Sequence, residues 1–255
     1  MNKPAMIIFD YGHTLLCEQN IDFMRGQKAL FEHIKSNKYN LTPEQVHTFA
    51  RGLFEEVNPV RESGIELHHH QYERFVYEYL GIEFSIPVCE VERVWWENSA
   101  PAALMPNVNK MLNYINANGI RSAVISNIGW SGTALTERIN RLLPQNKFEF
   151  IIASSEYMFR KPSPMIFELA LRKANLNPSD VWFCGDNVEA DAEGSAAVGI
   201  FPVWYEDKTL ENPWHKPAEM PPNCEHLHIH DWFELIEVLD KLPVHESDKS
   251  PVVAH

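Results

Sequence analysis

The chain has 255 residues, of which 45% are hydrophobic and 22% charged, a composition typical of a folded globular protein and not of a disordered or fibrous one. Its formal net charge of −13 argues against a nucleic-acid partner, because we find no local basic patch that would offset repulsion by the phosphate backbone. The four cysteines lie far apart and form no CxxC pair, so they predict neither a zinc site nor a disulfide framework; they are Cys17, Cys89, Cys184 and Cys224.

The N-terminal apolar run is interrupted by Asp10 before it reaches the length of a signal peptide. No stretch approaches the roughly 18 apolar residues of a membrane span. We therefore expect a cytoplasmic protein with reduced thiols and no membrane partner.

Short apolar runs that end at polar turns predict strands of a parallel sheet with both faces buried. They are residues 5–9, 122–125, 148–153, 181–184 and 201–205. Segments with an apolar spacing of about 3.6 residues lie between them and predict helices; these are 108–115, 135–143 and the run MIFELALRKA that follows Ser163-Pro164. This alternation predicts an α/β fold, a Rossmann-like parallel sheet flanked by helices.

The interval from 18 to 100 contains amphipathic segments but no convincing strand run. Its expected helices are 23–34, 43–57, 71–80 and 88–96. Because the interval leaves the core after the first strand and returns before the second, we expect a helical cap above the carboxyl edge of the sheet, where ligands bind in such folds. The core would then comprise 1–17 and 101–241, and residues 242–255, which show no periodicity, are expected to form a disordered tail.

Polar residues follow the first two strands directly. Asp10 comes after the first strand, where an exposed carboxylate is a candidate nucleophile. The second strand ends in Ser126-Asn127, whose hydroxyl and amide are candidates to hold phosphate oxygens.

The third and fourth strands are also followed by residues suited to an anionic ligand. Lys161 precedes a helix N-terminus, where it would neutralise both a phosphate and a carboxylate. Asp186 and Asp191 flank the turn after the fourth strand and offer the hard oxygen ligands that Mg²⁺ prefers. Because all these residues follow strands of one parallel sheet, they should meet at one edge.

The ordered set resembles the four motifs of the haloacid dehalogenase superfamily; in this chain they are Asp10, Ser126, Lys161, and Gly185-Asp186 with Asp191. The resemblance covers residues 5 to about 240. It implies that Asp10 attacks phosphorus, that Ser126 and Lys161 hold the transferring group, and that the later aspartates bind Mg²⁺ with Asp10 and the Gly12 carbonyl. The inserted segment lies where the family has its C1 helical cap, and the interval between Ser126 and Lys161 is too short for the alternative cap site.

One position departs from the family pattern. Phosphatases of the family usually read Asp-x-Asp, and the second aspartate protonates the leaving group, but this chain has Gly12 there. Loss of a general acid typically costs about 10²- to 10⁴-fold in rate. The neighbouring His13 is a candidate replacement, because an imidazole titrates near neutrality, and it joins the candidate phosphate-binding residues.

Three other functions remain open from the sequence. A metal-independent haloacid dehalogenase would tolerate Gly12, because a halide leaves without a proton. A phosphate-ester-binding protein with weak catalysis would also fit. A phosphonate-cleaving enzyme would need a cap lysine, and only Lys28, Lys35 and Lys38 are available, none with a distinguishing signature. The favoured interpretation is a Mg²⁺-dependent hydrolase of phosphorylated small molecules, with the substrate and the oligomeric state undetermined.

Two runs in the insert are expected to be structural. The run His68-His69-His70 has poor metal-binding geometry, because consecutive helical residues point in different directions. The pair Trp95-Trp96 is expected to pack where cap and core meet, since large aromatics mostly serve burial.

Overall fold

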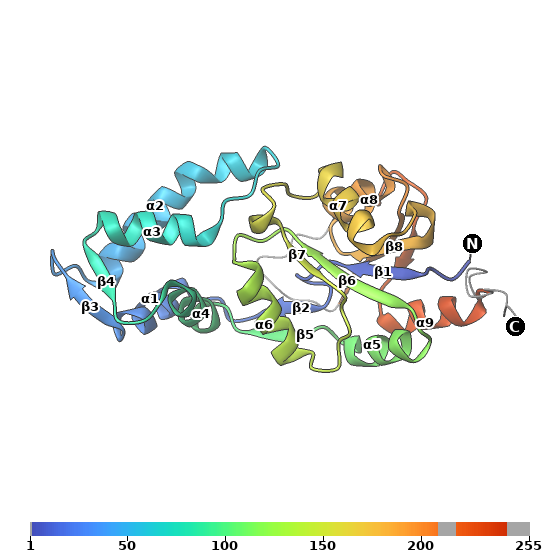
Figure 1. The fold of residues 1–255 in the computed structure, drawn as a ribbon, viewed down its shortest axis with the longest axis horizontal. Helices are drawn as coiled ribbons and strands as arrows, with labels where there is room; N and C mark the ends of the chain where they lie inside the picture. Colours follow the sequence, from blue (N-terminus) through green and yellow to red (C-terminus); the bar gives the residue numbers. More distant parts are fainter. Residues whose placement is uncertain (1, 209–217, 244–255) are drawn as a thin grey trace, which may run out of the picture.

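The computed structural model describes residues 2–208 and 218–243 and shows a parallel-sheet core with a helical insert that extends beyond one end of it (Figure 1). The sheet has six strands in the order β10-β9-β8-β1-β6-β7, and every neighbouring pair is parallel. The predicted α/β class is confirmed.

The central strands are apolar because both faces of the sheet are covered. All four residues of β1 are buried; Met6 and Ile8 face one layer, whereas Ile7 and Phe9 face the other. The strand bounds are β1 Met6–Phe9, β6 Arg121–Ser126, β7 Ile151–Ala153, β8 Val181–Gly185, β9 Phe201–Tyr205 and β10 Leu227–Ile229.

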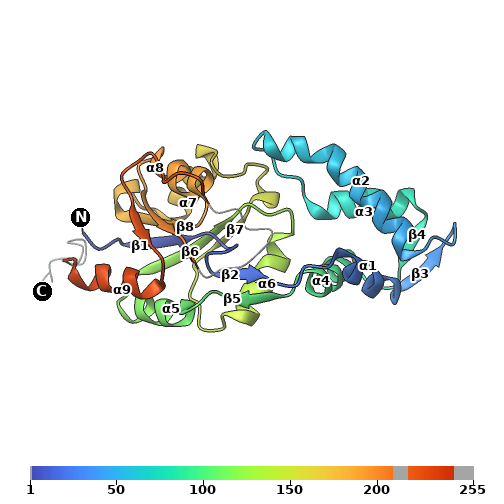
Figure 2. The same ribbon diagram turned by 180° about the vertical axis from the view of Figure 1, so that it is seen from behind.

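Helices form a layer on each face of the sheet (Figures 1 and 2). One face packs against α5 (Val108–Ala117), α6 (Gly132–Leu142) and α9 (Trp232–Lys241), and the other packs against α7 (Pro164–Ala174). The edge strand β10 and the helix α9 were not among the predicted elements. In β10 only Leu227 and Ile229 are apolar, and the alternating histidines give the segment no continuous apolar run.

The insert contains four helices that surround a small apolar cluster of its own, which includes Leu30, Val46 and Val76. The helices are α1 (Phe23–Phe31), α2 (Pro43–Glu62), α3 (His69–Tyr79) and α4 (Val88–Ser99). The start of α2 is fixed by a capping box between Thr42 and Gln45.

The prediction that the insert lacks strands was wrong. Strand β3 (Ile34–Asn37) pairs with β4 (Ile82–Phe84), and β2 (Leu16–Glu18) pairs with β5 (Ala102–Leu104) where the chain leaves and re-enters the core. These strands have three or four residues, and their pairing partners lie far away in the sequence, so local patterning does not reveal them.

Only the first residues of the expected C-terminal tail are described. The Pro243 carbonyl accepts a hydrogen bond of 3.1 Å from the Lys3 N–H, so residue 243 remains hydrogen-bonded to the segment that precedes β1. Residues 244–255 lie outside the described part. Within the described ranges, none of the helices combines the length and the apolar character that a membrane crossing requires.

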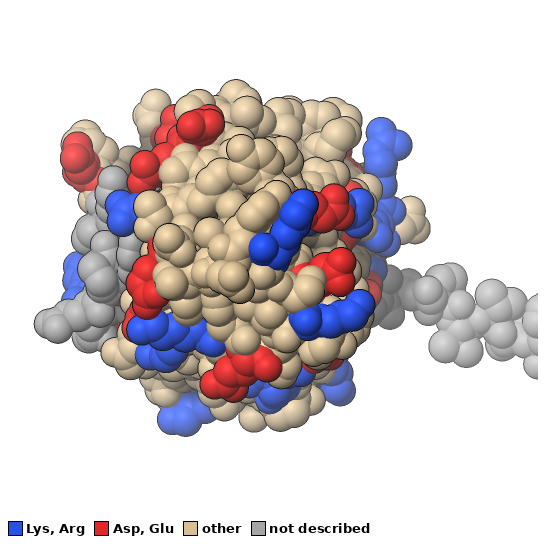
Figure 3. Space-filling view, turned by 90° about the vertical axis from the view of Figure 1, so that its left-hand side faces the viewer, with Lys and Arg blue, Asp and Glu red and all other residues tan. Residues whose placement is uncertain are grey.

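The end of the molecule formed by the insert presents a large uncharged area with acidic and basic side chains interspersed around it (Figure 3). Neither sign of charge forms a continuous patch on this face.

The junction of core and insert depends on one buried arginine. Arg138 on α6 is 1% exposed, its guanidinium lies 3.9 Å from the ring centre of Trp96, and it donates a hydrogen bond to the Ala100 carbonyl. It also pairs with Glu18 at 3.1 Å and with Glu97 at 3.4 Å. Trp96 therefore packs at the junction, as predicted.

We expect Arg138→Ala to destabilise the protein by about 2 kcal/mol or more, because it removes a buried cation that pairs with Glu18 and Glu97 and packs on Trp96. The partial exposure of the two carboxylates keeps the loss below that of a fully buried pair. Arg141→Ala is the matched control, because Arg141 also pairs with Glu97 but is 54% exposed, and its loss should cost less than about 1 kcal/mol. Urea unfolding of the two variants measures the difference. Equal losses would show that Arg138 does not hold the junction.

Candidate active site

The predicted site residues line one cavity of about 350 Å³ at the carboxyl edge of the sheet. Strand β1 lies between β6 and β8, and the residues that follow these three strands point into the same space. The lining includes every predicted site residue, namely Asp10, Gly12, His13, Ser126, Asn127, Lys161, Asp186 and Asp191.

Lys161 lies at the centre of the charged cluster. Its Nζ donates to Asp10 Oδ1 and to Asp191 Oδ1, both at 2.6 Å, and to the Ile125 carbonyl at 3.1 Å. Burial opposes the charged form of this lysine, but the two carboxylates raise its pKa above the ordinary value. Lys161 is therefore a fixed cation beside the candidate nucleophile.

The cluster holds more negative charge than Lys161 neutralises. Burial raises the pKa of Asp10, and the neighbouring Asp186 raises it further, against the lowering effect of Lys161. Burial likewise raises the pKa of Asp191 to about 6. A further cation would stabilise the ionised form of these carboxylates.

The geometry of the three aspartates fits a metal ion with hard oxygen ligands. Asp10, Asp186 and Asp191 each offer one carboxylate oxygen, and these atoms lie within 4.8 Å of one another. Both oxygens of Asp191 are already engaged, one by Lys161 and the other by the Asn187 N–H at 3.0 Å. The carboxylates of Asp10 and Asp186 are thus the ones best placed to take a cation, with Asp191 orienting Lys161.

Several residues position the cluster. Asn127 accepts a hydrogen bond from the Lys161 N–H and donates to the Lys161 carbonyl, both at 2.7 Å, so its amide fixes the lysine backbone. Asp186 accepts from the Thr14 hydroxyl at 3.4 Å, and its carbonyl accepts from the Trp204 indole at 3.2 Å. The Ser126 hydroxyl lines the cavity and makes no hydrogen bond with any residue that the structure describes.

Gly12 and His13 form the turn after β1. A Cβ at Gly12 would meet only Asp10 Oδ2, at 3.9 Å, so the backbone there leaves room for a side chain. His13 has a left-handed conformation, with φ of 53°, and its Nδ1 lies 3.7 Å from Asp186 Oδ2. The imidazole thus lies beside the cluster and remains a candidate proton donor.

Two buried glutamates attach the insert to the core near this edge. Glu92 of α4 accepts hydrogen bonds from the Ser131 N–H and hydroxyl, both at 2.6 Å, at the start of α6. Glu66, between α2 and α3, accepts a hydrogen bond from the Ser154 hydroxyl at 2.9 Å and pairs with Arg160, which lines the cavity. Polar contacts from a cap helix and a cap loop therefore hold it on the core.

The three consecutive histidines pair with three different glutamates and do not converge. His68 lies 3.5 Å from Glu156, His69 lies 3.2 Å from Glu73, and His70 lies 2.8 Å from Glu92. Among the described residues, no group of potential metal ligands includes them.

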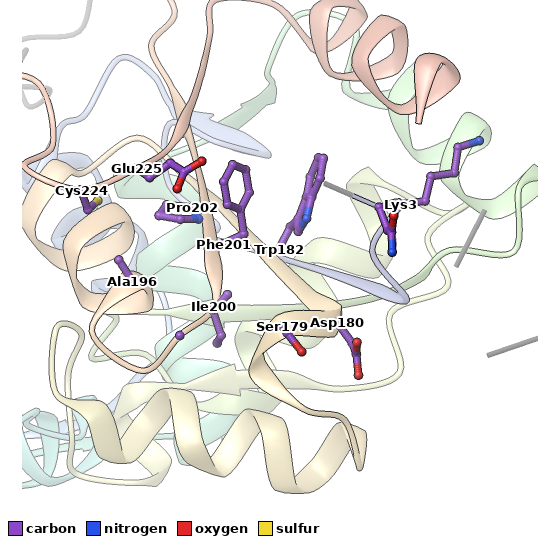
Figure 4. Close-up of a pocket in the computed structure, with 12 residues that line it drawn as sticks. Lys3, Ser179, Asp180, Trp182, Ala196, Ile200, Phe201, Pro202, Cys224 and Glu225 are labelled. Carbon is purple, nitrogen blue, oxygen red and sulfur yellow. The ribbon is translucent and has the colours of Figure 1, made fainter. Parts of the chain in front are cut away.

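A larger hollow of about 630 Å³ lies at the opposite edge of the sheet, where β8 and β9 begin (Figure 4). Its lining includes Lys3, Asp180, Trp182, Phe201 and Glu225. It lacks a buried lysine flanked by carboxylates, and ligands in this architecture bind at the carboxyl ends of the strands. The smaller cavity is therefore the candidate active site.

Residues 7–204 match the family model of haloacid dehalogenase-like hydrolases. The chain belongs to this family. It is 29% identical over 209 residues to the glyceraldehyde 3-phosphate phosphatase of Pyrococcus furiosus, covering 80% of this chain and 82% of that protein. It is also 23% identical over 211 residues to the ribulose-1,5-bisphosphate 5-phosphatase of Halopiger xanaduensis, covering 78% and 84%.

Solved structures of haloacid dehalogenase-like proteins share the fold. A 2-haloacid dehalogenase from Pseudomonas syringae superposes with a TM-score of 0.61 at 21% identity, and a HAD phosphatase from Thermococcus onnurineus with 0.60 at 16% identity. Each match covers 94% of this chain and 99% of the other. At these identities the likeness establishes the fold alone.

Sequence reasoning did not identify the residues that support the haloacid dehalogenase-like motifs. They are Thr14, Glu66, Glu92, Arg160 and Trp204. Gly185 was named from the sequence as part of the fourth motif, but the space that it leaves for Asp191 was not predicted. A Cβ at Gly185 would lie 2.3 Å from Asp191 Oδ2, so only glycine lets Asp191 reach Lys161.

We expect Gly185→Ala to lower turnover by about 10²-fold, because displacement of Asp191 by the methyl group would misplace Lys161 and the nucleophile. Gly52→Ala is the matched control, since a Cβ at this α2 position meets nothing within 4 Å. It should keep full activity. Steady-state kinetics of the two variants, with circular dichroism to verify folding, measure the effect, and an active Gly185→Ala enzyme would contradict the assigned role of Asp191.

Proposed function

We propose that this protein is a Mg²⁺-dependent phosphatase of small phosphorylated molecules, in which Asp10 becomes transiently phosphorylated. The observation that carries the proposal is the position of Lys161 between Asp10 and Asp191, with Asp186 alongside. Relatives named as sugar-phosphate phosphatases, matched over most of both chains, support a phosphate ester as substrate. The cavity of about 350 Å³ suits a small molecule.

The residues suggest how the reaction proceeds. Asp10 Oδ2 attacks phosphorus and the bond to the leaving oxygen breaks, which gives an acyl phosphate on Asp10 and a leaving oxygen that takes a proton from solvent. Water then attacks the same phosphorus, returns a proton to solvent, and releases inorganic phosphate and the carboxylate. Lys161 and the Ser126 hydroxyl hold the phosphoryl oxygens as charge shifts among them. Mg²⁺ bound by Asp10 and Asp186 would supply the positive charge that lets an anionic nucleophile approach an anionic phosphate.

A haloacid dehalogenase is the second candidate, because Gly12 supplies no acid and a halide needs none. The acidic cluster argues against it, since three carboxylates around one lysine favour a bound cation that halide release does not require. Turnover of haloacids that survives removal of divalent cations would favour this candidate.

We expect Asp10→Asn to lower phosphatase activity by about 10³-fold or more, because an amide is a poor nucleophile while its size is nearly unchanged. The melting temperature should stay close to that of the wild type. Asp180→Asn, at the opposite edge of the sheet, is the matched control and should remain active. Substantial activity in Asp10→Asn would rule out Asp10 as the nucleophile.

The rate should depend steeply on the basicity of the leaving group, because Gly12 donates no proton. Acyl and nitrophenyl phosphates should therefore be cleaved faster than sugar phosphates. Gly12→Asp should raise the rate on alkyl phosphates by about 10²-fold, with a smaller gain on activated ones, since it restores a proton donor at a position where an added Cβ meets only Asp10 Oδ2, at 3.9 Å. If the wild type cleaves both substrate classes at equal rates, with chemistry rate-limiting, another residue must donate the proton. A selective loss of activity on alkyl phosphates in His13→Ala would identify His13 as that residue.

A further inference from the structure

Strand β10 has the sequence Leu-His-Ile, and a histidine stands on each side of it. Because side chains alternate along a strand, Leu227 and Ile229 pack into the core, whereas His226, His228 and His230 share the other face. Neighbouring β9 pairs in parallel register, with His228 opposite Trp204. Glu206, directly after β9, therefore comes next to His230.

The side chains on this face converge. Glu206 Oε2 lies 3.2 Å from His228 Nε2 and 3.6 Å from His230 Nδ1. One ligand atom from each of the three residues falls within 4.8 Å of the others. The side chains are between 24% and 35% exposed, so an ion can reach them from solvent.

Local contacts orient the two imidazoles. His228 stacks on the Trp204 indole, with ring centres 4.0 Å apart and planes at 14°. His230 Nδ1 also lies 2.9 Å from the Glu206 carbonyl, a contact that holds the ring beside its partner and that an ion bound to this nitrogen would replace. Aromatic stacking fixes the ring of His228, whose Nε2 lies 3.2 Å from the Glu206 carboxylate.

We propose that Glu206, His228 and His230 form a second metal site, which takes a divalent transition ion such as Zn²⁺. Two imidazoles and one carboxylate form a ligand set that suits zinc, whereas Mg²⁺ prefers oxygen ligands alone. Three protein ligands leave a coordination position for water. His228 lies on β10, and Glu206 and His230 directly follow β9 and β10, outside the Asp10 cluster; no cysteine takes part.

The test is a calorimetric titration of the untagged protein with Zn²⁺. Saturating Mg²⁺ is present throughout, so that the acidic cluster of the active site is already occupied. The wild type should bind one Zn²⁺ with micromolar or tighter affinity and melt at a higher temperature once loaded. His228→Ala and His230→Ala should each weaken zinc binding by about 100-fold. Loss of a group that only hydrogen-bonds a metal ligand already costs about 10- to 100-fold in affinity, and loss of a ligand itself should cost at least as much. Co²⁺ in place of zinc should give visible absorption bands that disappear in both variants.

His226→Ala is the matched control, because His226 shares the same face of β10 but lies outside the convergent group. It should bind zinc as the wild type does, and all three variants should keep phosphatase activity in Mg²⁺. The proposal fails if wild-type protein binds no zinc under these conditions. It also fails if His226→Ala loses as much affinity as His228→Ala, or if loss of both His228 and His230 leaves binding unchanged.

Discussion

The buried lysine between two aspartates governs the architecture of the active-site edge. Lys161 follows β7, and it reaches Asp10 after β1 and Asp191 after β8 because these strands lie in the order β8-β1-β6-β7, which brings segments far apart in the sequence within hydrogen-bonding distance. A lysine buried in this way is stable only with compensating carboxylates, and the carboxylates in turn need the lysine. Gly185 and Asn127 maintain the arrangement, the first by leaving space and the second by holding the Lys161 backbone.

The same cluster links the electrostatics of the cavity to its chemistry. Burial raises the pKa of Asp10, and the neighbouring Asp186 raises it further, so a bound cation would favour the ionised form of the candidate nucleophile. The cap adds a second constraint, because Glu66 and Glu92 are buried against core residues. Separating the insert from the core would require these carboxylates to exchange hydrogen bonds with the protein for hydrogen bonds with water, so the junction is stabilised by polar contacts as well as apolar ones.

The sequence predicted the features that depend on continuous local patterns. The parallel strands around β1 each contain a continuous apolar run, and the polar residues that follow these runs could be placed at one edge from topology alone. Short strands such as β3 and β10 escaped prediction because their pairing depends on partners far along the chain. Supporting residues such as Glu92 also escaped, since a glutamate on an amphipathic helix shows no sign that it will be buried against Ser131. Gly12 was recognised as a departure, but the space beside it became visible only in the structure.

The central claim is that Asp10 accepts the phosphoryl group. The most direct measurement is the amount of labelled phosphate bound covalently to the protein during turnover. The protein turns over an acyl phosphate labelled at phosphorus, the reaction is quenched with acid, and peptide mapping locates the label. The account predicts acid-stable, alkali-labile label on the peptide that contains Asp10, and none in Asp10→Asn. Turnover without labelled protein under conditions in which dephosphorylation is slow, or label on a different residue, would contradict it.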